Sequence, residues 1–191
     1  HDPRNYLVAT GWCIDNQPVQ YEYYRNPEDA AKSDWFAKAL AGQKVYVAHN
    51  ATFEIHWNLK VYGDVFLKWL KDGGKIWCTQ LAEFLLTHQL ELYPRLEDTA
   101  VKYGGTKKVD EVKLLWQAGY KTSEIDEALL IEYLADEHCG DVANTRLVCF
   151  KQVAEAKRRG MYEMMQMRMD GLLFNAIATY NGLYVNAEIA A

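Results

Sequence analysis

The chain has 191 residues, enough for one α/β domain with a full hydrophobic core and a short additional element. Hydrophobic residues make up 50% of it and charged residues 25%, a globular composition that argues against intrinsic disorder. The formal net charge of -5 excludes a generally basic surface for nucleic acids. A nucleic acid would therefore have to bind at a local surface or through metal ions.

Cysteine spacing and hydropathy indicate the cellular compartment in which the protein is expected. Cys13, Cys78, Cys139 and Cys149 are widely separated and form no Cys-x-x-Cys pair, which argues against zinc and predicts buried, reduced thiols. No run of 18 apolar residues occurs, and no signal peptide opens the chain. We therefore expect a cytoplasmic protein without membrane association.

The first third of the chain predicts a hairpin and then a strand between helices. Residues 6–14 are apolar, residues 19–24 alternate, and the turn-forming DNQP between them favours an antiparallel hairpin. A helix is expected over 27–40. The short apolar segment 44–48 (KVYVA) predicts a central strand buried on both faces, and a helix follows over about 52–61.

The rest of the chain is mainly helical. We expect a short strand at 75–77 and helices over 80–87, from Thr122 to about 134, and from about Asp141 to about 158. A hairpin followed by alternating strands and helices predicts an α/β fold, with a mixed sheet flanked by helices. Residues 161–191 carry methionines at helical spacing, which indicates either core packing or a connector to another domain.

The sequence HNATFE, residues 49–54, places polar groups at the end of the expected central strand. Open α/β sheets carry their active sites at this end, so that Glu54 is a candidate for chemistry. In the first turn of a helix, Glu54 would meet the positive end of the helix dipole and stay ionised, ready for a cation. The alternative is structural, with Asn50 simply capping the helix.

A second group of acids lies near the expected last helix. Tyr133, Glu137 and Asp141 are spaced by four residues and would share one face if the helix were continuous, although Gly140 interrupts it. Two hard acids, Glu54 and Asp141, would suit Mg²⁺ or Mn²⁺. The alternative is that these carboxylates are a solvated surface. No Ser-His-Asp grouping, glycine-rich phosphate loop or dinucleotide fingerprint occurs.

Taken in order, these segments resemble the DEDD superfamily of 3′–5′ exonucleases. HNATFE is similar to the second motif of that family, Asn-x-x-Phe/Tyr-Asp, and KIWCTQLAEFLL to the strand and helix that follow it. In GDVANT, Asp141, Val142 and Thr145 match the third motif, Asp-Val-x-x-Thr. The chain resembles most the proofreading domain of family A DNA polymerases of phage type.

The resemblance implies a ribonuclease-H-like fold and hydrolysis of phosphodiesters at the 3′ end of single-stranded DNA. Two divalent ions, Mg²⁺ or Mn²⁺, would be held by Glu54 and Asp141. Tyr133 or His138 would orient the attacking water. The substrate-binding residues would be His49, Asn50 and Phe53. Residues 1–158 would form the exonuclease domain, and residues 159–191 a helical connector toward a covalently linked polymerase domain.

The chain departs from the family pattern at three places. The first motif, Asp-x-Glu, is absent from the sequence, which predicts that it lies upstream of His1 together with the first strand of the sheet. Glu54 stands where the family has Asp. Glu137 stands where the family has the third-motif tyrosine, so that Tyr133 would fit only across a local insertion.

These departures keep two other functions open. One is a degenerate exonuclease fold that binds DNA or serves a structural purpose, and the other is an exonuclease that trims RNA. Lys107-Lys108 and Arg158-Arg159 would either contact phosphates or remain ordinary solvated charges.

Overall fold

The computed structural model describes residues 5–106 and 111–182. Its first element is a hairpin in which β1 (Ala9–Trp12) pairs antiparallel with β2 (Gln20–Tyr23), with Ala9 opposite Tyr23. The predicted hairpin is confirmed, with strands shorter than expected.

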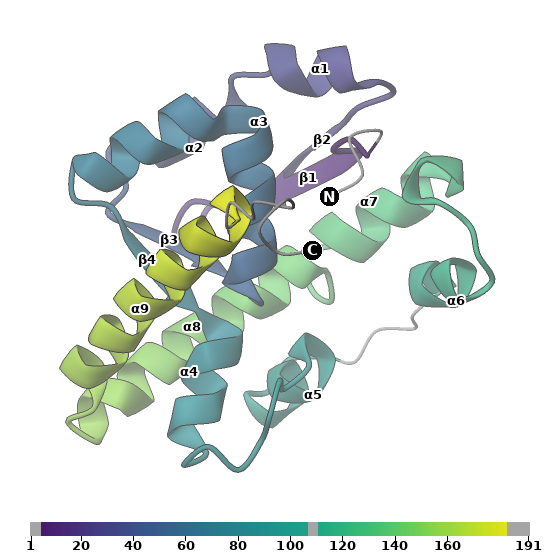
Figure 1. Ribbon diagram of the computed structural model, residues 1–191. Helices are drawn as coiled ribbons and strands as arrows, with labels where there is room; N and C mark the ends of the chain where they lie inside the picture. The colour runs from purple at the N-terminus through teal and green to yellow at the C-terminus, as the bar shows by residue number, and fades with distance from the viewer. Residues whose placement is uncertain (1–4, 107–110, 183–191) are drawn as a thin grey trace, which may run out of the picture.

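A second pair of strands follows the first helices. In it, β3 (Val45–Ala48) runs parallel to β4 (Lys75–Cys78), with Ala48 opposite Cys78. The prediction of a central strand buried on both faces is wrong for the described residues, because β3 pairs only with β4 and Val45 is 45% exposed. The described strands thus belong to an α/β fold with two separate two-stranded sheets, where one mixed sheet was expected (Figure 1).

The helix expected over 27–40 is divided into α1 (Pro27–Lys32) and α2 (Trp35–Leu40). The Asn26 side chain caps α1 by accepting a hydrogen bond from the Asp29 N–H at 3.0 Å. At the break, the Ser33 hydroxyl donates to the carboxylate of Glu22 on β2. The same hydroxyl accepts from the Trp35 N–H at 3.4 Å, and such a side-chain-to-backbone hydrogen bond competes with a continuous helix.

Helix α3 (Ala51–Lys71) crosses from β3 to β4 and extends well beyond the predicted end at residue 61. It bends at Tyr62, whose φ of -127° and ψ of 31° are not helical. The Tyr62 hydroxyl donates to the Ala30 carbonyl at 3.2 Å and accepts from Trp35 Nε1 at 3.0 Å. These contacts join the bend in α3 to α1 and α2.

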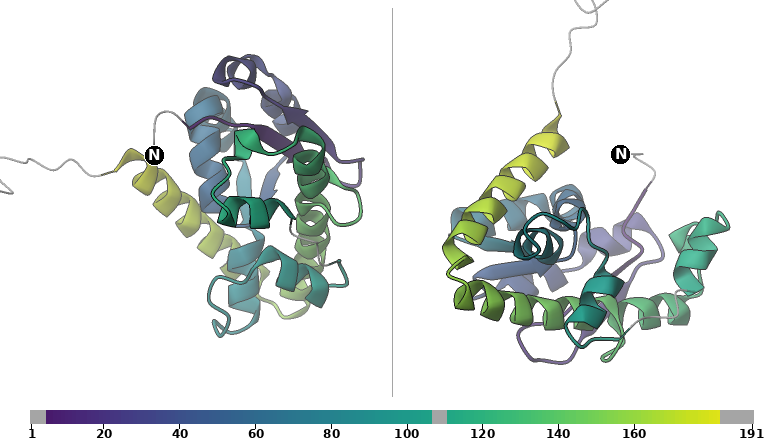
Figure 2. Two further views of the ribbon diagram at one scale, coloured as in Figure 1. Left: turned by 90° about the vertical axis from the view of Figure 1, so that its right-hand side faces the viewer. Right: turned by 90° about the horizontal axis from the view of Figure 1, so that it is seen from below.

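The remaining helices surround the sheets, and Figure 2 shows the last two running at an angle to each other. They are α4 (Thr79–Leu86), α5 (Leu96–Lys102), α6 (Glu111–Gln117), α7 (Glu127–Ala135), α8 (Asp141–Arg158) and α9 (Tyr162–Asn181), with a 3-10 turn η1 at Thr122–Glu124.

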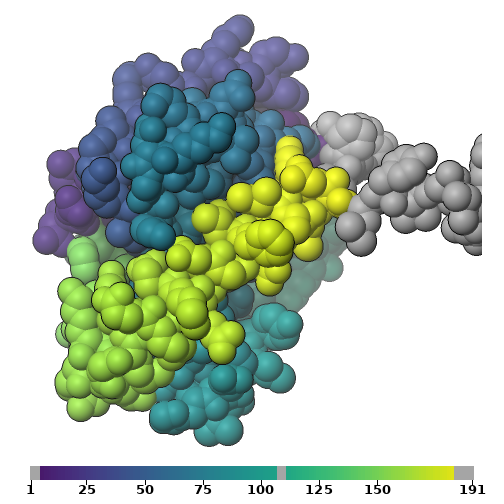
Figure 3. Space-filling view, turned by 60° about the vertical axis from the view of Figure 1, so that its left-hand side comes forward, coloured from purple at the N-terminus to yellow at the C-terminus, as the bar shows by residue number. Residues whose placement is uncertain are grey.

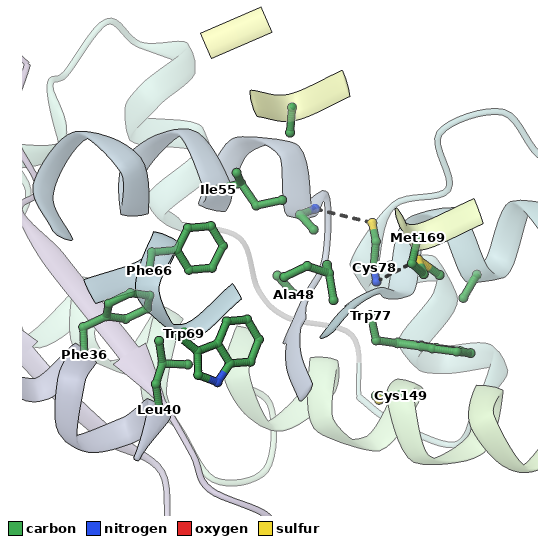
Figure 4. Close-up of a cluster of buried hydrophobic side chains, with 14 of the residues drawn as sticks. Phe36, Leu40, Ala48, Ile55, Phe66, Trp69, Trp77, Cys78, Cys149 and Met169 are labelled. Atoms are coloured by element: carbon green, nitrogen blue, oxygen red, sulfur yellow. Dashed lines mark hydrogen bonds between the residues drawn. The ribbon is translucent and has the colours of Figure 1, made fainter. Parts of the chain in front are cut away.

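The main hydrophobic core holds β3 and the first turns of α3 in place (Figure 4). Phe36, Ile55, Phe66 and Trp77 are each at most 1% exposed, and the Phe36 ring stacks on Tyr62 with centroids 5.1 Å apart. Burial of one large aromatic side chain stabilises a fold by roughly 4–6 kcal/mol as an upper value. The strand-to-helix elbow after β3 therefore rests on a well-packed support.

Helix α9 packs against this body, contacting α3 and β4, and it lies across the face shown in Figure 3. Met165 and Met169 are 0% exposed within the main core, so the methionine stripe serves packing here. Residues 183–191 of the predicted connector lie outside the described residues. No helix in the described parts of the chain is both long and apolar enough to cross a bilayer.

Candidate active site

The strand-to-helix elbow after β3 is tied to the end of β4. The Ala51 N–H donates to the sulfur of Cys78 at 3.4 Å, and the Leu81 N–H donates to the same sulfur at 3.5 Å, so that Cys78 also caps α4. Asn50 adopts a left-handed conformation with φ 54° and ψ 55°, which asparagine tolerates. Its side chain makes no capping hydrogen bond, so the capping explanation for Asn50 is wrong.

An open cleft of about 1310 Å³ adjoins this elbow and is lined by residues of β1, β3, α3 and α8. Glu54 in the first turn of α3 and Asp141 in the first turn of α8 both line it. The fold thus brings into one cleft the two acids that the sequence singled out from distant segments.

The surroundings of Glu54 disfavour its charged form. Burial, and then the negative charge of Asp141, raise the pKa of Glu54 to about 7. The expectation that the helix dipole keeps Glu54 readily ionised is therefore wrong. A dipole contributes only about 0.3–1 kcal/mol, whereas a pKa change of this size corresponds to roughly 3 kcal/mol.

His49 is held by two hydrogen bonds within the protein. Its Nε2 lies 3.0 Å from the Pro94 carbonyl oxygen, and its Nδ1 lies 2.9 Å from the Thr79 hydroxyl. Because a carbonyl only accepts, Nε2 carries a proton. Burial lowers the pKa of His49, which favours the neutral ring accepting from Thr79. We therefore assign to His49 the positioning of the elbow against Pro94, where substrate contact was expected.

The other candidate side chains are divided between the cleft and the surface. Phe53 lines the cleft, is 54% exposed and contacts Trp57 edge to face, with centroids 6.4 Å apart. Tyr133 also lines the cleft and packs against a second small core, its ring meeting Trp116 at 5.7 Å. His138 is exposed and is not among the residues that line the cleft.

Tyr133, Glu137 and Asp141 do not share one helix face. Helix α7 ends at Ala135 and α8 begins at Asp141, so the continuous helix that a shared face would require is absent and the two separate helices expected there are confirmed. Glu137 instead accepts a hydrogen bond from the Val19 N–H at 2.5 Å and pairs with Arg146 at 3.4 Å. Its carboxylate is engaged with the loop between β1 and β2.

The cleft is also lined by positively charged side chains that no sequence motif indicated. Arg95, Lys113 and Arg146 lie in its wall, in a chain of net negative charge. Each also pairs with a nearby glutamate, and residue spacing gives no sign that they converge. The predicted pair Lys107-Lys108 lies outside the described residues.

Arg158 and Arg159 are engaged elsewhere. Both pair with Glu155, at 2.7 Å and 2.5 Å, and Arg159 also donates to the Leu86 carbonyl at 2.9 Å. Their hydrogen bonds hold the pKa of Glu155 down at about 2. This arrangement favours the alternative in which the two arginines are structural and solvated charges.

The thiols fit the sequence prediction in part. All four cysteines are free, Cys78 and Cys149 are buried, and Cys13 and Cys139 are partly exposed. Burial raises the pKa of the Cys78 thiol, which leaves its sulfur to act as a hydrogen-bond acceptor at the elbow.

The donor set for a metal ion consists of Glu54 and Asp141. Within residues 5–106 and 111–182, no group of three or more histidine, cysteine, aspartate or glutamate side chains is placed to hold an ion. Two carboxylates in one cleft, with the pKa of Glu54 raised by burial and then by the charge of Asp141, would suit a divalent cation. They would supply two carboxylate ligands to it.

Comparisons of the chain with protein-family models, with curated proteins and with solved structures gave no match. Any assignment of function therefore depends on the residues and geometry described above.

Proposed function

We propose that this chain is a ribonuclease-H-like 3′–5′ exonuclease domain that hydrolyses phosphodiesters at the 3′ end of single-stranded DNA as part of a DNA polymerase. The observation that carries the proposal is that Glu54 and Asp141, from distant segments, line one large cleft in which the charge of Asp141 acts on buried Glu54. The ordered resemblance of the surrounding segments supports it.

The roles of the residues follow from their positions. Glu54 and Asp141 would hold Mg²⁺ or Mn²⁺, which supplies Lewis acidity and lowers the pKa of a bound water. Exposed Phe53 offers a face on which the terminal base can stack, and Asn50, also exposed, lines the same cleft. Arg95 and Arg146 in the cleft wall are suited to hold the phosphate backbone.

Tyr133 is the better of the two candidates for orienting the attacking water. It lines the same cleft as the two acids, whereas His138 does not line it. A phenol hydroxyl can donate to or accept from a water, which suits this task.

A specific observation favours a second function, a degenerate exonuclease fold that binds DNA without cleaving it. The described residues bring only two acids together, and no third metal-binding side chain joins them. Such a module would keep the cleft cations and Phe53 while losing hydrolysis.

The two functions are separated by digestion of 3′-labelled single-stranded DNA with Mg²⁺ or Mn²⁺, using the full-length protein. The proposal expects activity that Asp141→Asn and Glu54→Gln each reduce by at least about 100-fold, since each removes a ligand acid. Asp64→Asn, an exposed acid on α3, is the matched control and should be unaffected. Binding of Mn²⁺ by the same variants, followed by electron paramagnetic resonance, tests the metal site without relying on activity.

DNA binding without cleavage by the unmodified protein would favour the degenerate module. Cleavage that is unaffected by Asp141→Asn would refute the assignment of this residue.

A further inference from the structure

We propose that Arg95 and Lys113 form a binding site for one phosphodiester group of a single-stranded nucleic acid, and that the Glu97 carboxylate occupies this site until the nucleic acid displaces it. The inference rests on the proposed nucleic-acid function and adds a contact that Glu54 and Asp141 do not provide. It does not require hydrolysis, so a protein that binds DNA without cleaving it would have the same site.

Two positively charged side chains meet one carboxylate oxygen in the wall of the cleft. Glu97 Oε1 lies 3.7 Å from Arg95 Nη1 and 3.4 Å from Lys113 Nζ, and all three residues line the cleft. The two cations come from separate elements, since Arg95 directly precedes α5 and Lys113 lies in α6. One negative charge therefore faces two positive charges, which leaves an excess of positive charge at this place.

The two ion pairs are long and accessible to water. Charged hydrogen bonds between such groups usually measure about 2.7–2.9 Å, and the pair of Arg158 with Glu155 has this length at 2.7 Å. The side chain of Arg95 is 71% exposed and that of Lys113 is 38% exposed. Exposed ion pairs contribute little to stability. An incoming anion can therefore take the place of Glu97 at a small cost.

A phosphodiester suits two cations better than a single carboxylate oxygen does. Its two non-bridging oxygens share the negative charge, so that each cation can receive an oxygen of its own at hydrogen-bond distance. The planar guanidinium of Arg95 can donate two parallel N–H bonds, and the Lys113 ammonium acts as a compact charge. Glu97, in contrast, presents the same oxygen to both cations.

The backbone that carries Arg95 is held next to the strand-to-helix elbow. The Pro94 carbonyl accepts hydrogen bonds from His49 Nε2 at 3.0 Å and from Gln80 Nε2 at 3.2 Å. The Arg95 carbonyl accepts from the N–H and the hydroxyl of Thr99, at 3.0 Å and 2.8 Å. Because His49 begins the elbow after β3, a nucleic acid bound by Arg95 would pass beside that elbow.

An aromatic ring beside Lys113 favours a nucleic acid over free phosphate. Trp116 follows Lys113 by three residues in α6, so the two side chains share one side of that helix, and both line the cleft. Trp116 is 39% exposed, and its Nε1 donates a hydrogen bond to the Thr122 hydroxyl at 3.2 Å, which positions the indole. A base attached to the bound phosphate can stack on such a ring.

The test compares two neighbouring acids of α5. Glu97→Gln and Asp98→Asn each remove one negative charge and keep the size of the side chain, but Asp98 is exposed and does not line the cleft. Binding of a fluorescein-labelled oligothymidine of about 12 nucleotides to the full chain is measured by anisotropy, in a chelator so that nothing is hydrolysed. We expect Glu97→Gln to bind at least about threefold more tightly than Asp98→Asn, because the phosphate no longer has to displace a carboxylate.

Further variants locate the effect at the two cations. In a protein that carries both Arg95→Gln and Lys113→Gln, the gain in affinity from Glu97→Gln should disappear, since the positive charges that Glu97 neutralises are gone. Lys32→Gln, at an exposed position of α1 outside the cleft, is the control for lost positive charge and should weaken binding less than Lys113→Gln. Urea unfolding of each variant shows whether a change in binding comes from a loss of stability.

Equal affinities of Glu97→Gln and Asp98→Asn would overturn the proposal, and so would a gain that persists without both cations. Lower stability of Glu97→Gln with no gain in affinity would show that Glu97 only ties α5 to α6. No DNA binding by any variant would refute this site and the proposed function together. Tighter binding by Glu97→Gln without nuclease activity would support the site and refute the nuclease alone. Orthophosphate that competes with the oligonucleotide at an equal concentration of phosphate groups would assign the site to a phosphomonoester instead.

Discussion

Replacing Glu54 by glutamine should change how the stability of the protein depends on pH. Glutamine keeps the size of the side chain and removes its charge. Because burial and Asp141 raise the pKa of Glu54 from 4.5 to about 7, the folded protein binds more protons than the unfolded chain between these two values. The contribution of Glu54 to the free energy of unfolding therefore falls as the pH rises through this window. The full loss of stability is reached above about pH 7.

The magnitude follows from the same two pKa values. At about 1.4 kcal/mol per pH unit, the move from 4.5 to about 7 gives roughly 3 kcal/mol. We expect Glu54→Gln to be more stable than the unmodified protein at pH 8, by up to roughly 3 kcal/mol. The two proteins should have nearly equal stability at about pH 3.5, where Glu54 is largely protonated in both states.

The assay is urea unfolding followed by tryptophan fluorescence at several pH values, with a chelator present so that no cation screens the carboxylates. Asp64→Asn on the same helix is the matched control, because Asp64 is an exposed acid that does not line the cleft. A Glu54→Gln difference that is independent of pH would refute the raised pKa of Glu54. Added Mn²⁺ should reduce the difference at pH 8, since a cation favours the ionised carboxylate.

Three further substitutions test how the fold is held together, each by urea unfolding. Lys102→Met should destabilise the protein by about 2 kcal/mol, because the Lys102 ammonium lies 2.5 Å from the fully buried carboxylate of Glu83; a loss below about 0.5 kcal/mol would contradict this. Gly74→Ala should cost about 2–3 kcal/mol, since its Cβ would overlap the ring of Trp69, and an unchanged stability would disprove that close approach. Cys78→Ala should cost about 1 kcal/mol by removing the helix cap, whereas Cys78→Ser should keep it; equal losses would argue against the cap.

Local sequence patterns predicted the elements that position the site. The DNQP turn with its flanking strands, the KVYVA strand and the α3 start all depend on neighbouring residues, and the structure has them close to the expected places. The same is true of the start of α8 at Asp141. These strands and helix starts were predictable because they depend on residues that are close together in the sequence.

The electrostatics of Glu54 could not be predicted in this way. Its pKa depends on burial and on Asp141, which a separate helix brings into the same cleft. The bond from the Ala51 N–H to the Cys78 sulfur and the inward hydrogen bonds of His49 similarly depend on groups from other elements. In each case, a contact between distant segments outweighed the local rule.

The turn between α7 and α8 explains why helical spacing failed for the third-motif residues. The Asp136 carboxylate accepts hydrogen bonds from the N–H groups of His138 and Cys139, both at 2.8 Å, and these bonds lower its pKa. A Cβ on Gly140 would lie only 2.5 Å from the Asp136 carbonyl oxygen, so the turn requires glycine there.

This turn separates α7 from α8 before Asp141. Residues four apart on its two sides therefore do not share one helix face. Tyr133, before the turn, still lines the cleft, while His138 within it is exposed. We therefore expect Gly140→Ala to disturb the angle between the two helices and to weaken any function of Tyr133 and Asp141 together. If nuclease activity is found, Gly140→Ala should reduce it far more than Gly63→Ala, whose Cβ meets no atom within 4 Å. Equal activity of the two variants would show that the turn does not set the geometry of the site.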